Sequence, residues 1–161
     1  MKRGFCLALP LLLALSANAP AAVNGIPSHG LRRLMDVPKA TRGDCLVAVA
    51  AMIAGHRTPA GHELTQLLTA NGVAHPDDLD RLDQPAERGY ACLLFMRAME
   101  DDGGLLYHVF RNSERFAYKH LEFLKMIPPG GHRMPISGPE LMALLSLAKA
   151  RATHWYGGAR R

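Results

Sequence analysis

The chain has 161 residues, of which 48% are hydrophobic and 20% are charged, and its formal net charge is +5 at pH 7. This length suits one compact domain with a modest core. The excess positive charge lies at the two ends of the chain, in Lys2 and Arg3 and in three arginines near the C-terminus, Arg151, Arg160 and Arg161. Nucleic-acid binding needs a clustered basic face, so this distribution argues against a nucleic-acid partner.

The first residues have the pattern of an export signal. Lys2 and Arg3 form a basic segment, Leu7 to Leu15 form an apolar run too short to span a bilayer, and Ala17 to Ala22 supply small residues for cleavage. We expect residues 1–21 to be a signal peptide, whose removal takes away two cations and lowers the net charge from +5 to +3. The mature chain is then expected in the periplasm, at the cell surface or outside the cell, without a transmembrane segment.

Removal of this signal leaves two cysteines, Cys45 and Cys92. An exported protein meets oxidising conditions, so one interpretation is a disulfide between them. The other is a pair of buried thiols that act as small apolar side chains. Both interpretations stay open at this point, because a disulfide depends on geometry.

The mature chain begins with residues 22–30, which predict an extended leader, and continues with a short helix that ends at Pro38. The next helix is predicted over residues 41–54, where apolar side chains recur at spacings of three and four. Thr41 and Asp44 resemble a capping box at its start, although Asp reaches the backbone less well than Glu.

Two helices and a break are predicted in the middle of the chain. A helix that begins at Pro59 closes at Asn71-Gly72, and a polar stretch follows it. Residues 87–99 predict the most buried helix, because apolar residues cover a wide part of its surface. Asp101 to Gly104 break this helix, and a few of the residues 105–110 are expected to be extended.

Two more helices are predicted in the last third. One starts at Asn112 or Ser113 and is ended by Pro128-Pro129. The other covers residues 137–150, and it opens with the clearest capping box of the chain, Ser137 with Glu140. Strand signals are nearly absent, so the predicted fold class is all-α.

Residues 151–161 are expected to form a basic disordered tail. The tail contains Trp155-Tyr156 beside its arginines. A second interpretation is therefore a tag for an anionic envelope polymer or for membrane headgroups.

One local pattern occurs three times in the chain. Its copies begin at residues 39, 85 and 135, so they lie 46 and 50 residues apart (85 − 39 and 135 − 85), and each opens an apolar run. A helix and a turn precede each copy, which predicts three units of a helix, a loop and a capped helix in one compact domain over residues 31–150. Repeat units usually form binding or scaffolding surfaces, so we expect a protein that is not an enzyme.

These units resemble the S-layer homology family over about residues 31–148. Asp36-Val37 is similar to the Asp-Val opening of that family, and Thr41-Arg42-Gly43-Asp44 is similar to its Thr-Arg-Ala-Glu helix start. Glu87-Arg88-Gly89-Tyr90 matches the same start at Arg and Gly only, and Phe116-Ala117-Tyr118 is similar to the family's aromatic-Ala helix. The resemblance implies three helical units around a pseudo-threefold axis, with noncovalent attachment to an often acidic polysaccharide of the cell envelope.

In that family the Arg at the capped helix start contacts the anionic sugar, and this role carries over to Arg42 and Arg88 as ligand-binding residues. Gly138 holds the corresponding position in the third copy. A helix N-terminus supplies free amides and the positive end of a dipole, and a guanidinium adds a planar fork for a carboxylate. The alternative is two surface arginines whose stems pack on a neighbouring helix. The expected partner is an envelope polysaccharide or another envelope protein.

No metal, cofactor or catalytic group is expected. No two histidines have the i, i+4 spacing of a helical zinc site, and a nucleophile elbow, a P-loop and a haem attachment motif are missing from the sequence. Three aspartates lack the spacing and the bidentate Glu of a calcium loop and are expected to be solvated: Asp77, Asp78 and Asp80. Two other functions stay open, a small secreted enzyme that uses His or Cys chemistry and a helical adaptor for another exported protein.

Overall fold

The protein is described by a computed structural model over residues 31–55, 59, 61–101, 103, 107, 109–110 and 112–158, with backbone only for 153–158. The predicted signal peptide and leader lie outside the described residues. The described part is mostly helical and contains no β-strand, only two isolated bridges. The prediction of an all-α fold is therefore confirmed.

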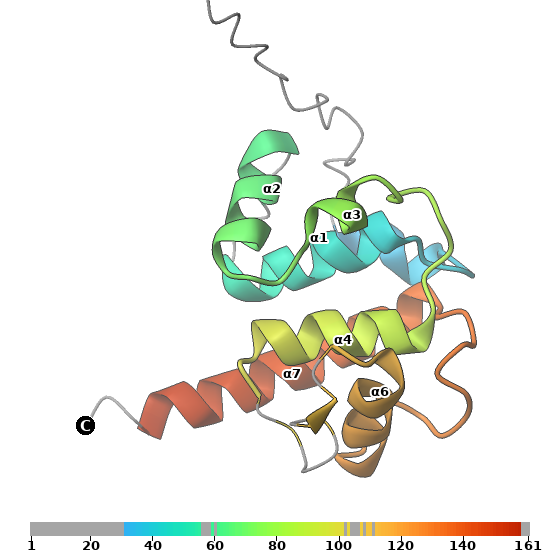
Figure 1. Cartoon of the computed structure of the whole chain (residues 1–161), viewed down its shortest axis with the longest axis vertical. Coiled ribbons are helices and arrows are strands. Elements are labelled where there is room, and N and C mark those ends of the chain that lie inside the picture. The colour runs from blue at the N-terminus through green and yellow to red at the C-terminus, as the bar shows by residue number, and fades with distance from the viewer. Residues whose placement is uncertain are drawn as a thin grey trace, which may run out of the picture.

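The helices follow one another in the order shown in Figure 1. They are a short 3-10 helix η1 (Leu31–Asp36) and the α-helices α1 (Arg42–Ile53), α2 (Gly61–Ala70), α3 (Pro76–Leu79), α4 (Arg88–Ala98), α6 (Glu114–Phe123) and α7 (Gly138–Gly158). The helices predicted over residues 41–54 and 87–99 are confirmed as α1 and α4, and the one predicted from residue 137 is confirmed as the first part of α7.

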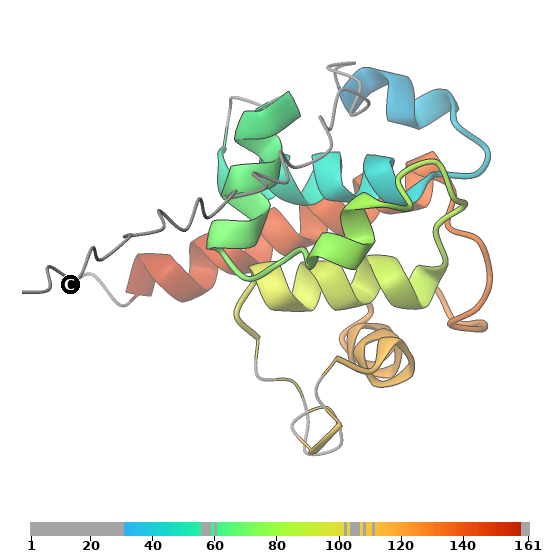
Figure 2. The same ribbon diagram turned by 45° about the horizontal axis from the view of Figure 1, so that its top comes forward.

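Three long helices, α1, α4 and α7, pack on one another at the centre of the molecule, and the shorter helices surround them (Figures 1 and 2). α2 lies mainly against α1, α6 against α4, and η1 against α7. The repeated sequence pattern predicted that each outer helix forms a unit with the long helix that follows it. In the structure each outer helix packs on the long helix that precedes it, and η1 closes the circle by packing on the last one.

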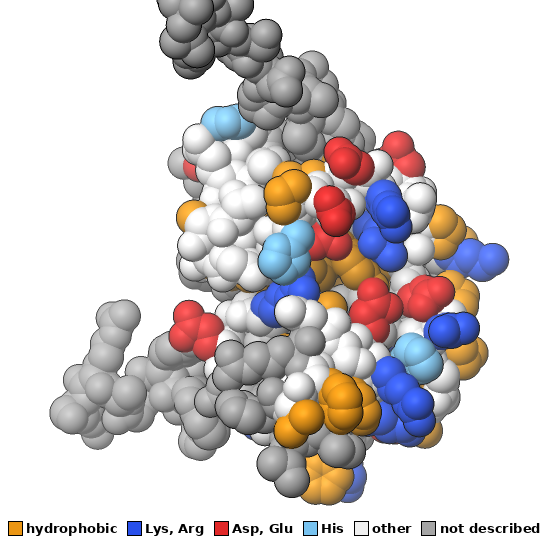
Figure 3. Space-filling model, in the orientation of Figure 1, with side chains coloured by type: hydrophobic (Ala, Val, Ile, Leu, Met, Phe, Trp, Pro, Cys, Tyr) orange, Lys and Arg blue, Asp and Glu red, His pale blue; other side chains and the backbone are white. Residues whose placement is uncertain are grey.

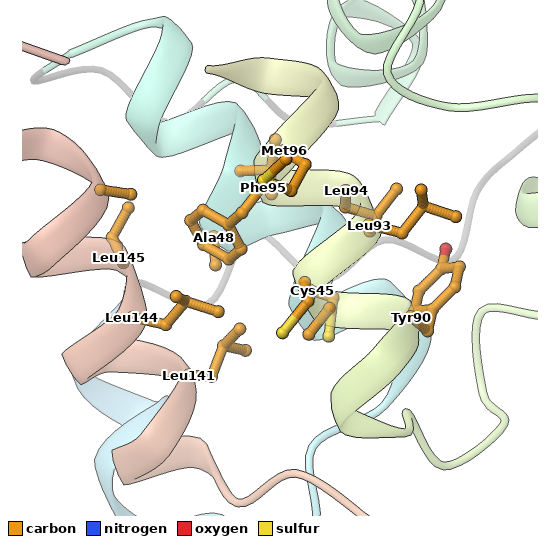
Figure 4. Packing of buried hydrophobic residues seen from close by; sticks show 14 of the residues in the cluster. Cys45, Ala48, Tyr90, Leu93, Leu94, Phe95, Met96, Leu141, Leu144 and Leu145 are labelled. Atoms are coloured by element: carbon orange, nitrogen blue, oxygen red, sulfur yellow. The ribbon is translucent and has the colours of Figure 1, made fainter. Parts of the chain in front are cut away.

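The core lies where the long helices meet. Leu141, Leu144 and Leu145 of α7 point toward Ala48 of α1 and Phe95 of α4 (Figure 4). These five side chains are at most 3% exposed. α1 is buried over most of its circumference rather than along one stripe, because α2, α4, α7 and η1 all contact it.

The last helix is longer than predicted. α7 continues to Gly158, so residues 151–158 are helical where the sequence analysis placed a disordered tail. Between Pro139 and Gly157 the sequence contains no helix breaker and is rich in Ala and Leu, which favour helix. Residues 159–161 lie outside the described part of the chain.

Three local features also differ from the sequence analysis. α6 ends at Phe123, before the prolines, because Lys125 adopts a left-handed conformation (φ 57°) and the Met126 amide donates to the Leu121 carbonyl at 2.9 Å. The one-turn helix α3 was not predicted. Within the segment expected to be extended, Tyr107 and Val109 are helical.

Candidate functional site

The chain enters α1, α4 and α7 through three residues that hydrogen-bond to one another in a closed ring. The Ala40 amide donates to the Ile136 carbonyl (2.9 Å), the Ile136 amide donates to the Ala86 carbonyl (3.0 Å), and the Ala86 amide donates to the Ala40 carbonyl (2.8 Å). All three residues have 0% exposure. Each directly precedes the residue that opens a long helix, so the ring brings the three copies of the sequence pattern together: Thr41, Glu87 and Ser137.

The first amides of the long helices donate to loop carbonyls. Those of α1 donate to Gln84 and Leu82, and those of α4 donate to Met134 and His132, at 2.7 to 2.9 Å. The first amide of α7 donates to Val37 at 2.8 Å. The expectation that free amides at these helix starts help to bind an anion is therefore wrong, because the loop that leads into the next long helix already accepts from them. Any anion at these junctions has to be held by side chains.

Arg88 is buried, with 9% exposure, and its guanidinium pairs with the carboxylate of Glu140 at the start of α7. The same guanidinium has Nη1 3.8 Å from the sulfur of Met134. Burial opposes ionisation of Glu140, but the Ser137 amide and Arg88 outweigh it and lower the pKa of Glu140. Arg88 therefore joins the starts of α4 and α7 and is committed to a partner within the protein.

Arg42 is more open than Arg88. Its guanidinium lies over the ring of Tyr90, 4.4 Å from the centroid, as in a cation–π contact. Arg42 Nη1 is 4.0 Å from Oδ1 of Asp78, which is an ion pair without a hydrogen bond, and 22% of the side chain is exposed. The donors of Arg42 are thus held in place but are not saturated by the nearby carboxylate.

Asp78 lies at the centre of this junction. Its second oxygen is 4.0 Å from Nη1 of Arg97 and accepts the His75 amide at 2.9 Å. Asp78 is 15% exposed at its side chain, so the expectation of a solvated carboxylate is wrong for this aspartate. The Tyr90 hydroxyl is buried and has no hydrogen-bond partner among the described residues, and burial followed by the charge of Asp78 raises the pKa of Tyr90.

The third junction has no arginine for a steric reason. A Cβ added at Gly138 would lie 1.7 Å from the carbonyl oxygen of Leu34 in η1. Backbone from η1 therefore occupies the space that a side chain would need at this position. The departure of the third copy from the Thr-Arg pattern follows from the way η1 packs on α7.

The surface around Arg42 carries charges of both signs. Figure 3 shows basic, acidic and histidine side chains interleaved on one face of the molecule, rather than gathered by sign. Glu114 is half-buried here, and burial raises its pKa while the charge of Arg42 lowers it. The side chains around Arg42 therefore include both hydrogen-bond donors and acceptors.

The cysteines are free thiols within the core. Cys45 and Cys92 are both buried, and burial is the main cause that raises the pKa of each, to about 12 for Cys92. Such thiols resist the ionisation that a nucleophile needs. Among the described residues, no group of three or more His, Cys, Asp or Glu side chains is placed to hold a metal ion.

Comparisons with known proteins found no relative. No protein-family model matches the sequence, no curated protein matches it, and no solved structure matches the fold. In the part of the chain that the structure describes, no helix has the length and apolar character needed to cross a membrane.

Arg42 and Arg88 were predicted from the sequence as site residues, but their partners were not. Arg42 contacts Tyr90, and Arg88 contacts Glu140. In both cases the arginine at the first position of one long helix contacts the residue at the third position of the next long helix. This rule is visible in the sequence only after the three copies are aligned and placed in a circle.

Proposed function

We propose that this protein is an exported, non-catalytic module of the cell envelope that binds an anionic polysaccharide at the junction of α1 and α4. Its architecture is three units around a pseudo-threefold axis, each formed by a long helix and the outer helix packed on it. The backbone ring of Ala40, Ala86 and Ile136 supports this architecture, because the three copies take equivalent places in it.

Arg42 is the ligand-binding residue in this proposal. The observation that carries it is the position of the guanidinium, stacked on Tyr90 and 4.0 Å from Asp78, with part of the side chain exposed. The Tyr90 ring fixes the planar fork before a ligand arrives, so less side-chain entropy is lost on binding. A carboxylate of the polymer accepts from the free donors, and Asp78 accepts from a neighbouring sugar hydroxyl.

Arg88 has a structural role in the same proposal. Its guanidinium is held by Glu140 and enclosed near Gly130 and Met134, so a ligand has little access to it. One of the two arginines implied by the resemblance is therefore assigned to binding and the other to the joint between α4 and α7. The partner remains an envelope polysaccharide, and no cofactor or metal takes part.

The proposal is tested by retention of the protein on purified envelope polysaccharide. Arg42→Lys is expected to weaken retention about tenfold, because Lys keeps the charge but loses the planar fork. Arg115→Lys, at an exposed position on α6, is the matched control and is expected to bind like the wild type. Carboxyl-reduced polysaccharide is expected to retain the wild type poorly.

Two results would contradict the proposal. The first is equal retention of folded Arg42→Lys and wild-type protein. The second is a pair of results: deletion of residues 153–161 abolishes retention, and the separate Arg42→Lys variant is retained normally. That pair would assign polysaccharide binding to the C-terminal segment.

A further inference from the structure

A group of exposed apolar side chains lies on and beside α6. Val109 is 64% exposed, Phe110 is 51% exposed and Phe123 is 82% exposed. Phe110 stacks on Phe116, with ring centroids 5.0 Å apart and an interplanar angle of 17°. We call these four residues the aromatic patch. Figure 3 shows hydrophobic side chains gathered at the lower edge of the molecule, where α6 and the segment leading into it lie in Figure 1.

Three members of the aromatic patch are exposed, whereas Phe116 is partly buried and packs against the core. Ala117, Tyr118 and Leu121 fill the core side against α4. Phe116 and Phe123 are seven residues apart, about two helical turns, and therefore share one side of the helix. Packing on the core accounts for Phe116, but it does not account for an aromatic residue as exposed as Phe123.

Most of the exposed charged side chains around the aromatic patch are positive. Arg115, Lys119 and Lys125 are exposed on α6 and just after it. Glu114 is half-buried, and Glu122 pairs with Lys119 at 2.6 Å, so these two side chains offset each other and Arg115 and Lys125 supply the excess positive charge. An approaching surface therefore meets aromatic rings flanked by long cationic side chains.

We propose that the aromatic patch and its three cations dock the protein on an anionic phospholipid membrane. Aromatic side chains enter the boundary between headgroups and acyl chains, and lysine and arginine side chains reach the lipid phosphates. A second copy of the chain fits less well, because a symmetric contact through this patch places Arg115, Lys119 and Lys125 opposite the same residues of the other copy. The side chains of this docking surface are different from Arg42, Tyr90 and Asp78, which form the proposed polysaccharide junction.

The test is co-sedimentation of the processed chain with phosphatidylglycerol/phosphatidylcholine vesicles and with vesicles of phosphatidylcholine alone. We expect binding to the anionic vesicles to be at least about tenfold stronger and to weaken with added salt. Phe123→Ser is expected to lower the partition coefficient about tenfold without loss of helicity, because the ring is exposed in the fold. Leu147→Ser, at an exposed position on α7, is the matched control and is expected to bind normally.

The cations are tested by a triple variant, Arg115→Gln, Lys119→Gln and Lys125→Gln, which is expected to lose the preference for anionic vesicles. Its control is Arg32→Gln, Arg33→Gln and Lys39→Gln, three exposed cations elsewhere, and it is expected to keep that preference. Arg42→Lys is also expected to bind vesicles normally, so this proposal and the polysaccharide proposal fail independently. Three results would overturn the inference. The first is equal vesicle binding by Phe123→Ser and wild type, and the second is equal binding of the wild type to both vesicle types. The third is self-association of the protein that Phe123→Ser abolishes.

Discussion

The arginines that open α1 and α4 occupy the same place in the sequence pattern but have different partners. Arg88 is almost enclosed and pairs with Glu140, whereas Arg42 rests on the ring of Tyr90 and keeps part of its guanidinium at the surface. The difference arises at the third position of the next long helix, which is an acid in one case and an aromatic ring in the other. The same position of a short repeated motif therefore holds a buried ion pair in one copy and a partly exposed cation–π contact in another.

Glu140 makes the stability of the protein depend on pH. The pKa of Glu140 in the folded protein is below the usual value of 4.5. The stabilisation that the Glu140 carboxylate provides is therefore present above pH 4.5 and is lost as the pH falls through the folded pKa. Glu140→Gln leaves the buried Arg88 without a counter-charge and is expected to cost about 2 kcal/mol at pH 7. Urea unfolding at pH 7 and pH 3 measures both effects. The variant should lose less stability in acid than the wild type, and equal acid sensitivity would contradict the assignment.

Gly138 is expected to tolerate no side chain. In Gly138→Ala the new Cβ meets the Leu34 carbonyl, so η1 has to move away from α7 at a cost of about 3 kcal/mol. Gly131→Ala is the matched control, because its Cβ would meet Met134 at an ordinary 3.5 Å. Thermal unfolding of both variants separates the two cases, and similar midpoints would show that η1 is not held as described.

At the scale of the elements, the helix starts were predictable and the helix packing was not. Capping residues and apolar spacing placed α1 and the start of α7, and apolar spacing placed α4, because these signals are local in the sequence. α3 was missed because its single turn is stabilised by Asp78, which also faces two arginines from other parts of the chain. The ion pair between Arg88 and Glu140 joins residues from different helices, and no local pattern announces such a contact.

The cap of α7 gives a prediction at this scale. Ser137 Oγ accepts the Glu140 amide at 3.3 Å, and the Glu140 carboxylate accepts the Ser137 amide at 3.0 Å. Ser137→Ala is expected to lower the free energy of unfolding by about 1 kcal/mol through loss of this cap. Glu87→Ala is the control, because the Glu87 side chain makes no cap at the start of α4. A denaturant midpoint that is the same for both variants would argue against the cap.

At the scale of the whole molecule, the arrangement is closed rather than linear. η1, the first described element, packs on α7, the last one, and the backbone ring ties the three helix starts together. The family resemblance implied three units around a pseudo-threefold axis, but the repeated pattern did not specify the order in which the outer helices pack on the long ones. That order depends on contacts between the two ends of the described chain, and sequence spacing alone does not specify such contacts.

Hydrogen exchange at the amides of Ala40, Ala86 and Ile136 tests the closed arrangement most directly. Each amide is buried and donates to the next member of the ring. A closed ring predicts that all three exchange only through global unfolding, with exchange free energies that agree within about 1 kcal/mol. If the Ala40 amide exchanges at a much lower free energy than the other two amides, the first unit is loosely attached. That result would contradict the closed arrangement of the three helix starts.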